Sequence, residues 1–380
     1  MSTELGIGII GCGNISTTYF DFAPLFRGIK VVACADLDLA AAQARATQYG
    51  VEAQSVAALL DNPSVDLIIN LTIPGAHFAV AKAALEAGKH VYSEKPFVLS
   101  TQEGKELRDL AQSKGLSVGS APDTYLGGAH QQARAVLDAG DLGTIIAGTA
   151  YVMSHGMEHW HPNPDFFFQP GGGPMLDLGP YYLANLINLI GPVKRVAALT
   201  SSATPTRTIT SEPRAGETIE VNTPTNIHAL LEFAQGATVT LSTSWDVWAH
   251  RHGHMELYGT EGSLFLPDPN FFSGPVEIAG RDGAIAPVAP WDHPFGVPNQ
   301  EHKAGKLANY RSAGLADMAL ALLEGREARC SIDRAPHGID IMSAILRSGE
   351  EGGFVELSTT CTRPEPLDPD AARALLRRVA

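Results

Sequence analysis

The chain has 380 residues, of which 44% are hydrophobic and 18% charged, so it can bury more than one core and we expect two domains instead of disorder. Its formal net charge of −14 repels polyanions, which argues against a nucleic-acid partner. The four cysteines lie far apart without metal-ligand spacing, and we see neither a secretory leader nor a run of roughly 18 apolar residues, so we expect a cytoplasmic protein with reduced thiols and no membrane partner.

Short apolar runs alternate with alanine-rich helical stretches in the first third of the sequence. This alternation predicts a doubly wound parallel α/β sheet, the arrangement of a Rossmann domain. The pair Ala121-Pro122 is typical of a crossover into another fold, so we place this domain at residues 1–122. The expected strands are 7–10, 30–35, 67–71, 90–93 and 116–119, and the expected helices are 39–49, 56–60 and 78–87.

The remaining residues, 123–380, show a different pattern, with long extended runs and a strong helix at 175–190. Such an order predicts an α+β domain with a large, mostly antiparallel sheet. An exposed face on a sheet of this size favours a homodimer or homotetramer formed through it. We interpret the Pro-, Ser- and Thr-rich stretch 200–224 as a surface excursion. The expected strands are 144–153, 193–200, 228–233, 237–244 and 254–257.

The first chemical signal is a glycine turn between the first strand and the first helix. Gly11 permits the tight turn, and Gly13 lets the backbone approach a pyrophosphate at the helix N-terminus, beside Asn14 and Ile15. Ser16 occupies the third glycine position, where a small residue still allows the helix to pack closely on the strand. The turn therefore predicts a dinucleotide site.

Asp36 ends the second strand, about 20 residues beyond the turn, where a carboxylate can accept hydrogen bonds from an adenosine ribose. It would also repel a 2′-phosphate, and residues 37–39 contain no arginine that could neutralise one. We therefore expect NAD as the cofactor, with NADP less favoured. The alternative interpretation is that Asp36 only caps the following helix.

Two further segments lie at strand ends, where ligands bind in open α/β sheets. One runs from Asn70 to His77, and the other ends in Glu94-Lys95-Pro96, where the proline constrains the lysine to extended geometry. The alternative for Lys95 is a surface ion pair with Glu94. The cofactor-cleft candidates from these segments are Thr72, Pro74, His77, Glu94 and Lys95.

Taken together, these motifs resemble the Gfo/Idh/MocA family, named for glucose-fructose oxidoreductase, inositol dehydrogenase and rhizopine catabolism. The resemblance continues at residues 171–179, similar to the family's substrate-site helix, and at 256–262, similar to a strand and turn of its sheet. It implies an NAD-dependent dehydrogenase that transfers a hydride between nicotinamide and a carbinol carbon of a sugar or cyclic polyol. It also implies a Rossmann domain followed by a sheet domain that mediates oligomerisation.

By the same resemblance, Lys95 is the catalytic lysine, Asp177 its acidic partner, and Glu94 and His77 lie near the nicotinamide. Desolvation beside a positive nicotinamide would help Lys95 to exchange a proton with a hydroxyl. The chain departs from the family at Tyr181, where a histidine commonly follows the aspartate by four residues.

The i to i+4 spacing still places Asp177 and Tyr181 side by side on a helix. A phenol is a poor base at neutral pH. We therefore expect Lys95 to act as the principal acid/base, Asp177 to orient it, and Tyr181 to bind a hydroxyl or relay a proton. The alternative is that Tyr181 is a buried core residue.

Histidine-rich segments suggest carbohydrate recognition more than metal binding. His250, His252 and His254 alternate, but no cysteine or carboxylate completes a zinc site, and the resemblance requires no metal, so we expect none. Aromatic and imidazole groups suit sugar hydroxyls and C–H faces, although a plain loop anchor is the alternative. We therefore interpret the loop of His155 to His161 as a site of carbohydrate recognition, and the expected sugar-binding residues in it are His159, Trp160 and His161.

Two other functions remain open from the sequence. One is a glycoside-cleaving enzyme in which NAD is reduced and reoxidised within each turnover. The other is a non-catalytic NAD-sensing regulatory protein, which the missing histidine makes worth testing.

Overall fold

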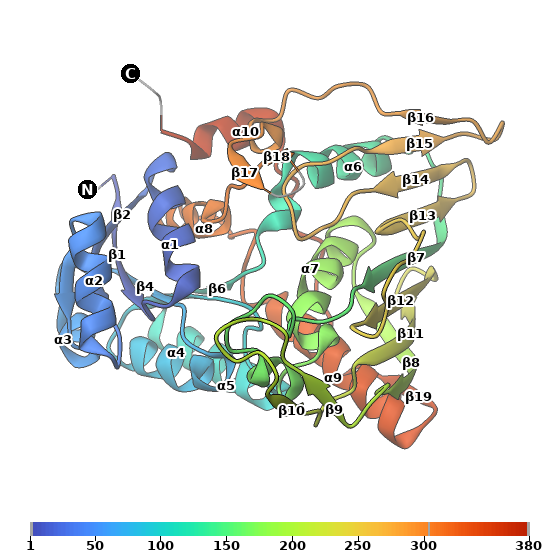
Figure 1. The fold of residues 1–380 in the computed structure, drawn as a ribbon. Helices are drawn as coiled ribbons and strands as arrows, with labels where there is room; N and C mark the ends of the chain where they lie inside the picture. The colour runs from blue at the N-terminus through green and yellow to red at the C-terminus, as the bar shows by residue number, and fades with distance from the viewer. Residues whose placement is uncertain (1–2, 303–304, 378–380) are drawn as a thin grey trace. The chain divides into compact units, whose positions relative to one another are not determined.

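The computed structural model describes residues 3–302 and 305–377 (Figure 1). The chain folds into two compact units: the first comprises Met1–Gly128, Asp292–Ile339 and Pro364–Ala380, and the second comprises Ala129–Trp291 and Asp340–Arg363. The division expected from sequence placed everything after residue 122 in one domain. Two later segments, Asp292–Ile339 and Pro364–Ala380, instead belong to the first unit. Hydrophobic periodicity could not predict this, because it is a local pattern.

The first unit contains a six-stranded parallel sheet in the order β3-β2-β1-β4-β5-β6. The order reverses between β1 and β4, and the carboxyl ends of strands at such a switch point are where open α/β sheets bind ligands. The expected doubly wound sheet is confirmed, with the short β3 added. The strands are β1 (Leu5–Ile10), β2 (Ile29–Ala35), β3 (Glu52–Gln54), β4 (Leu67–Asn70), β5 (His90–Ser93) and β6 (Val118–Ser120).

Local sequence signals set the helix ends in this unit. Asp38, Ser55 and Ser100 cap three helices with their side-chain oxygens, and Gly50 and Gly115 end two of them in left-handed conformation. The helices are α1 (Asn14–Phe22), α2 (Leu39–Tyr49), α3 (Val56–Asp61), α4 (His77–Glu86), α5 (Thr101–Lys114), α8 (Ala313–Glu324) and α10 (Pro369–Leu375). The short elements are η1 (Ala23–Leu25), η2 (Pro74–Ala76), η3 (Thr124–Leu126), η5 (Pro294–Gly296), β17 (Gln300–His302) and β18 (Gly305–Leu307).

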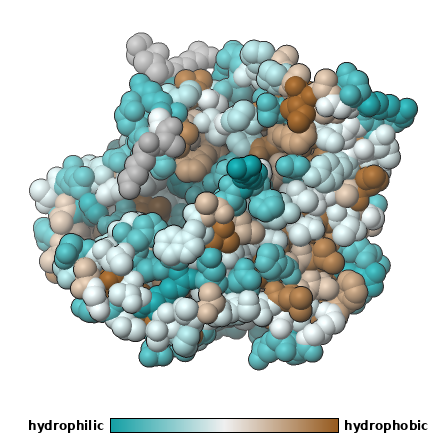
Figure 2. Space-filling view, turned by 45° about the vertical axis from the view of Figure 1, so that its right-hand side comes forward, coloured by the Kyte–Doolittle hydropathy of each residue, from teal (hydrophilic) through white to brown (hydrophobic). Residues whose placement is uncertain are grey.

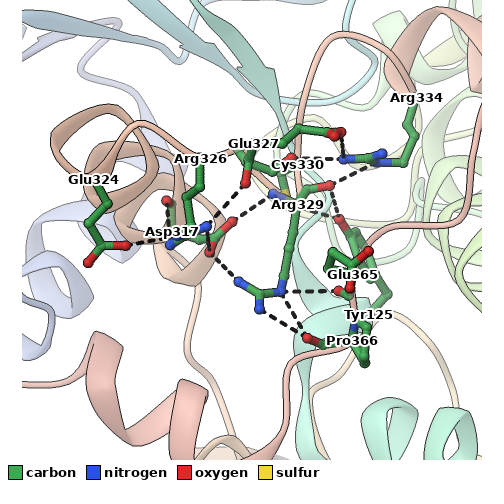
Figure 3. Close-up of polar contacts among 11 residues, drawn as sticks. Tyr125, Asp317, Glu324, Arg326, Glu327, Arg329, Cys330, Arg334, Glu365 and Pro366 are labelled. Atoms are coloured by element: carbon green, nitrogen blue, oxygen red, sulfur yellow. Dashed lines mark hydrogen bonds and ion pairs between the residues drawn. The ribbon is translucent and has the colours of Figure 1, made fainter.

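A buried carboxylate fixes the returning segments to the first unit. Asp317 in α8 is fully buried, and its Oδ1 pairs with Nη1 of Arg326 at 2.9 Å and Nη1 of Arg329 at 2.6 Å (Figure 3). Arg329 also donates to the carbonyl of Pro366 at 3.0 Å, and its own carbonyl accepts the hydroxyl of Tyr125 at 2.8 Å. Removing one partner of such a network leaves a buried charge unpaired, which typically costs about 3–5 kcal/mol.

The second unit is built on a nine-stranded sheet in the order β16-β15-β14-β13-β7-β12-β11-β8-β19. Its pairings are antiparallel except that of β7 with β12, so the expected mostly antiparallel sheet is confirmed. The strands are β7 (Ile145–Met153), β8 (Val193–Ser201), β11 (Asn226–Phe233), β12 (Thr238–Ser244), β13 (Met255–Gly259), β14 (Ser263–Leu266), β15 (Glu277–Ala279), β16 (Ile285–Pro287) and β19 (Phe354–Glu356).

Helix α7 (Pro174–Leu189) contacts β7 and β12 of this sheet. Helices α6 (Gly128–Ala139) and α9 (Ala335–Glu351) each begin in the first unit and continue into the second, and η4 (Asp165–Phe168) precedes α7. The stretch 200–224 carries a small hairpin of β9 (Thr206–Thr208) and β10 (Thr218–Glu220). A separate apolar cluster lies between this hairpin and the loop after β7, formed by Met157, Phe168, Ile209, Ile219 and Trp245.

Figure 2 shows hydrophobic and hydrophilic residues interspersed over the face in view. Among the described residues, no helix is both long enough and apolar enough to cross a bilayer.

Candidate functional site

The glycine turn leaves the N-terminus of α1 open. Gly11 has φ +102°, and a Cβ there would lie 2.6 Å from the carbonyl carbon of Leu71, so the turn requires glycine. Gly13 is the exposed N-cap residue of α1, where no side chain caps the helix and an added Cβ would meet nothing within 4 Å. Free backbone N–H groups, the helix dipole and open space together suit an anionic group such as a pyrophosphate.

The carboxylate of Asp36 is held against this turn. Its Oδ2 accepts from the backbone N of Cys12 at 2.7 Å and its Oδ1 from the backbone N of Asp38 at 2.9 Å. Asp38 caps α2, accepting from the backbone N of Ala40 at 2.9 Å. The alternative that Asp36 caps this helix is therefore wrong, because its neighbour does so.

Arg45 is a neighbour of the turn that sequence reasoning missed. It extends from α2 to the glycine turn, donating from Nε to the carbonyl of Cys12 at 3.3 Å and from Nη2 to that of Gly13 at 3.5 Å. The inspection of residues 37–39 could not find it, because Arg45 lies two helical turns further along the chain. The positively charged side chain of Arg45 therefore lies at the turn, where its guanidinium donates hydrogen bonds to backbone carbonyls.

His77 connects the two strand-end segments. It is buried at the start of α4, with Nδ1 2.7 Å from the carbonyl of Pro96 and Nε2 3.0 Å from the carbonyl of Thr72. The hydroxyl of Thr72 donates to Oδ1 of buried Asn70 at 2.7 Å, and Asn70 Nδ2 donates to the carbonyl of His77 at 2.9 Å. Both ring nitrogens therefore face protein carbonyls, and the histidine holds the loops after β4 and β5 together. Pro74 is the first residue of η2, the short element that directly precedes α4.

Glu94 anchors the backbone of Lys95. Its buried carboxylate accepts from the hydroxyl of Tyr19 at 2.8 Å and from the backbone N of Lys95 at 2.9 Å, and its own N–H donates to the carbonyl of Asn70. Burial and the Glu94 charge raise the pKa of Tyr19 well above its usual value, so this phenol stays a donor. Lys95 itself is half-buried at the end of β5.

A second buried carboxylate lies after β6. Asp123 Oδ2 accepts from the backbone N atoms of Ser312 at 3.1 Å and Gly314 at 3.0 Å. Burial raises the pKa of Asp123 to about 6, although these two hydrogen bonds oppose the shift. Ser312 adopts φ +97°, a conformation that few non-glycine residues hold.

The other catalytic candidates lie in the second unit. Asp177 is half-buried in the first turn of α7, where the helix dipole favours a carboxylate, and Tyr181 is buried one turn later. Gly173, with φ +91°, starts this helix. The expected i to i+4 helical spacing of the two side chains is present.

The histidine-containing loop after β7 borders a pocket of about 400 Å³. Of the three expected sugar-binding residues, His159 lines it, whereas Trp160 and His161 do not belong to the lining. His161 instead accepts from the backbone N of Asn163 at 3.0 Å and packs edge-on against Phe167. Two of the other lining residues, His155 and Glu158, lie in the loop of His155 to His161 that we expected to recognise carbohydrate. Sequence reasoning missed the remaining three, which are Thr208, Thr210 and Trp248.

The alternating histidines do not gather around one point. His252 stacks on Tyr151 with ring centroids 4.0 Å apart, and His254 Nδ1 lies 3.2 Å from the hydroxyl of Tyr182. Within residues 3–302 and 305–377, no group of three or more His, Cys, Asp or Glu side chains is placed to hold a metal ion.

Sequence comparison identifies the family. Residues 5–121 match the oxidoreductase family domain with an NAD-binding Rossmann fold, and residues 130–265 match the Gfo/Idh/MocA C-terminal domain. The chain belongs to the Gfo/Idh/MocA oxidoreductase family. The resemblance carried by the motifs is thereby confirmed, and the parallel sheet of the first unit belongs to an NAD-binding Rossmann domain.

The chain is similar in sequence to several proteins named as oxidoreductases or dehydrogenases. The uncharacterised oxidoreductase YdgJ of Escherichia coli is 32% identical over 200 residues, covering 50% of this chain and 55% of that protein. D-xylose dehydrogenase of Paenarthrobacter nicotinovorans is 26% identical over 318 residues, covering 79% of each protein. Alignments with YdgJ and three other uncharacterised oxidoreductases span between 38% and 55% of those relatives.

Solved structures share the fold. A levoglucosan dehydrogenase in complex with NADH matches with a TM-score of 0.78 at 21% identity, covering 94% of this chain and 100% of that one.

Proposed function

We propose that the protein is an NAD-dependent oxidoreductase that transfers a hydride between nicotinamide and a carbinol carbon of a sugar or cyclic polyol. The observation that carries this is the uncapped N-terminus of α1 at Gly13, with the Asp36 carboxylate held beside it. Relatives named D-xylose dehydrogenase and levoglucosan dehydrogenase support a sugar as the substrate class.

Bound NAD supplies the hydride acceptor. In this proposal, Lys95 exchanges the hydroxyl proton, because its backbone is fixed by Glu94 at the end of a strand facing the ligand edge of the sheet. Asp177 orients the reacting groups, and Tyr181 donates a hydrogen bond to a substrate hydroxyl. The buried phenol of Tyr181 suits a donor better than a base.

The cofactor preference follows from charge at the glycine turn. The Asp36 carboxylate accepts from two backbone N–H groups, which keeps it at the turn, and it would repel a 2′-phosphate. Arg45 is engaged with two loop carbonyls, and leaving them to pair with a phosphate would cost those hydrogen bonds. These contacts support NAD over NADP.

We also propose that the protein works in the cytoplasm and pairs through the outer face of its nine-stranded sheet. Leu230 and Phe354 are exposed there, and the register places both opposite Ala197 of β8, with exposed Leu199 further along that strand. Adjacent apolar side chains on a sheet face favour contact with a second copy.

The test is to mix the protein with NAD or NADP and a panel of neutral sugars, inositols and glycosides, and to follow the absorbance of reduced nicotinamide. Replacing Lys95 with Ala should lower turnover by about 10²- to 10⁴-fold while NAD still binds. The matched control is Lys105→Ala, an exposed lysine of α5 that pairs with Asp109 at 2.9 Å.

The two competing functions give different results in the same experiment. A redox-neutral glycoside-cleaving enzyme would release the aglycone of a glycoside without net nicotinamide reduction. NAD binding without turnover of any compound, and without sensitivity to Lys95→Ala, would indicate a sensor and overturn the proposal.

A further inference from the structure

A pocket of the first unit lies away from the glycine turn, beside the outer strand β6 of the parallel sheet. Its volume of about 360 Å³ is within the usual range of small-molecule sites. Residues 116–118 line it at the amino end of β6, whereas open α/β sheets bind their cofactor beyond the carboxyl ends of the strands. Three strand spacings, about 14 Å, separate β6 from β1. The pocket is therefore separate from the proposed NAD site.

One face each of α5 and α8 forms the walls of this pocket. Arg108, Ala111 and Gln112 follow the i, i+3, i+4 spacing that places side chains on one face of α5. Met318 and Leu322 are four residues apart and share a face of α8. More than half of the lining residues are apolar, so the walls favour a ligand with an apolar body.

Arg108 brings an unpaired positive charge to this pocket. The residue is half-buried, and within the described residues it makes no hydrogen bond and no ion pair. The helix itself offers no carboxylate, because the positions one turn away are Gly104, Lys105, Ala111 and Gln112. A guanidinium stays protonated in proteins, so the charge is present at every physiological pH.

The outer atoms of this guanidinium are within reach of a ligand. Nε of Arg108 is buried without a partner, and it remains inside the wall. The two Nη atoms also lack a partner in the described part of the chain, but they are not among its buried atoms. Two N–H groups in the plane of a guanidinium can hold a carboxylate through parallel hydrogen bonds.

The other charged groups of the lining are paired or exposed. Arg326 pairs with buried Asp317 at 2.9 Å (Figure 3). Glu327 pairs with Arg334 at 3.0 Å, also drawn in Figure 3. Asp333 is exposed and has no ion pair within residues 3–302 and 305–377. The lining therefore has one available cation and one available anion, which favours a ligand with a single negative charge and opposes a second one.

We propose that this pocket binds a small monocarboxylate with an apolar body. The carboxylate accepts hydrogen bonds from Nη1 and Nη2 of Arg108, and the body packs against Leu116, Met318 and Leu322. The Asp333 carboxylate disfavours dicarboxylates and phosphate esters. Because this binding requires neither NAD nor turnover, it goes beyond the proposed function and does not depend on it.

Isothermal titration calorimetry of the full chain tests the proposal with matched compounds. Hexanoate and benzoate are the monocarboxylates, hexanamide and benzamide are their neutral counterparts, and adipate and terephthalate are the dicarboxylates. At neutral pH and constant ionic strength, we expect at least one monocarboxylate to bind about tenfold or more tightly than its amide and its dicarboxylate. Binding of neither monocarboxylate would overturn the proposal, as would affinity no better than that of the amide or the dicarboxylate.

Removal of one charge locates the site. Arg108→Gln should weaken monocarboxylate binding by about tenfold or more, and Arg108→Lys, which keeps the charge but not the planar pair of N–H groups, should weaken it less. The matched control is Lys105→Gln, which removes a cation from an exposed position of α5 outside the lining. Its affinity should stay within about twofold of the wild type. An equal loss in Arg108→Gln and Lys105→Gln would indicate a general charge effect and contradict the proposal.

Stability separates a ligand-binding arginine from a structural one. Since Arg108 has no partner in the described part of the chain, Arg108→Gln should fold and melt at or above the wild-type temperature. A clearly lower melting temperature would indicate a structural arginine. Leu322→Ala then gives an independent measurement, because it shortens the apolar wall and should weaken binding by about three- to tenfold. Unchanged affinity in Leu322→Ala would exclude this pocket.

Titration at saturating NAD shows where the carboxylate binds. We expect the dinucleotide and the monocarboxylate to bind at the same time, because their sites lie at different strands and opposite strand ends. Mutually exclusive binding would place the carboxylate at the glycine turn and overturn the proposal. Monocarboxylate binding that Arg108→Gln weakens, without turnover of any sugar, would keep this pocket and remove the proposed dehydrogenase.

Discussion

The glycine turn of the first unit and the pocket of the second unit differ in which groups they expose. At the turn, the N-terminus of α1 is uncapped, and an added Cβ at Gly13 would meet nothing within 4 Å. Asp36, beside the turn, already accepts from backbone N–H groups with both carboxylate oxygens. The pocket is instead lined by the side chains of His155, Glu158, His159, Thr208, Thr210 and Trp248. The turn therefore offers backbone N–H groups and open space, whereas the pocket offers side chains.

This difference has an energetic consequence. The fold holds backbone groups in place before a ligand binds, so affinity at the turn depends on preorganisation. Side chains form hydrogen bonds only with particular groups of a ligand, which produces discrimination between similar compounds.

The strongest test of the backbone-built region is to add one methyl group at each glycine. Gly11→Ala places a Cβ 2.6 Å from the Leu71 carbonyl at φ +102°, so the free energy of unfolding should fall by about 3 kcal/mol or more. Gly13→Ala has free space and ordinary φ, so stability should change by less than about 1 kcal/mol, while NAD affinity falls on the order of tenfold. Urea unfolding and NAD titration measure both. Similar stabilities of the two variants would contradict this.

Asp123 tests whether a buried carboxylate that accepts backbone hydrogen bonds still destabilises the native state when it is charged. Its pKa of about 6 lies above the ordinary value of 3.8, so the native state holds the proton more tightly than the unfolded chain. This stabilisation is fully present below pH 3.8 and is lost as the pH rises through about 6. Relative to Asp123→Asn, the wild type should lose roughly 2 kcal/mol between pH 4 and pH 7.

Urea unfolding of both proteins across this pH range gives the difference directly. A difference that stays constant with pH would show that Asp123 titrates normally. Lowered stability of Asp123→Asn at every pH is compatible with the prediction, since the slope and not the offset carries it.

Charge at the turn should set cofactor choice. Asp36→Asn removes the carboxylate charge but keeps a hydrogen-bond acceptor, so the preference for NAD over NADP should shrink on the order of tenfold in kcat/KM. Asp38→Asn is the matched control, because it neutralises the neighbouring carboxylate and asparagine remains a good helix cap. An equal change of the NAD-over-NADP preference in both variants would mean that the Asp36 carboxylate does not determine this preference.

The smallest effect is expected at the pocket lined by His155 and Trp248. Trp248 is 83% exposed, so Trp248→Ala should change the free energy of unfolding by less than about 0.5 kcal/mol. Steady-state kinetics should show KM for the sugar raised about three- to tenfold with kcat unchanged, the pattern for a contact equally strong in ground and transition states. Trp160→Ala compares this pocket with the sequence-based expectation, and a larger rise in KM for that variant would favour the expectation.

The features that sequence reasoning found are those that local pattern encodes. The parallel strands, α7 and the turn at Gly11 follow from periodicity and glycine chemistry within a few residues. The contacts of His77 with two loops could not be predicted from the sequence, because they require the carbonyls of Thr72 and Pro96 to lie beside the same imidazole ring. The same holds for Arg45 at the turn, since its contact with Cys12 crosses from one helix to a distant loop.

The pocket lined by His155 and Trp248 was only partly predictable for the same reason. His159 stood out by its aromatic neighbours, but Trp248 and Thr208 reach the pocket from segments with no shared motif. Glu158 looks like any loop carboxylate in the sequence, and its importance comes from burial against Arg207, which no single-sequence pattern reports.

The return of late segments to the first unit has a consequence for synthesis on the ribosome. Phe26 pairs with Leu376, the backbone N of Arg27 donates to the carbonyl of Leu375, and that of Arg377 donates to Leu25. At about 5–20 residues per second, these partners emerge on the order of ten seconds or more after the glycine turn. These contacts of residues 25–27 can therefore form only after the whole second unit has been translated.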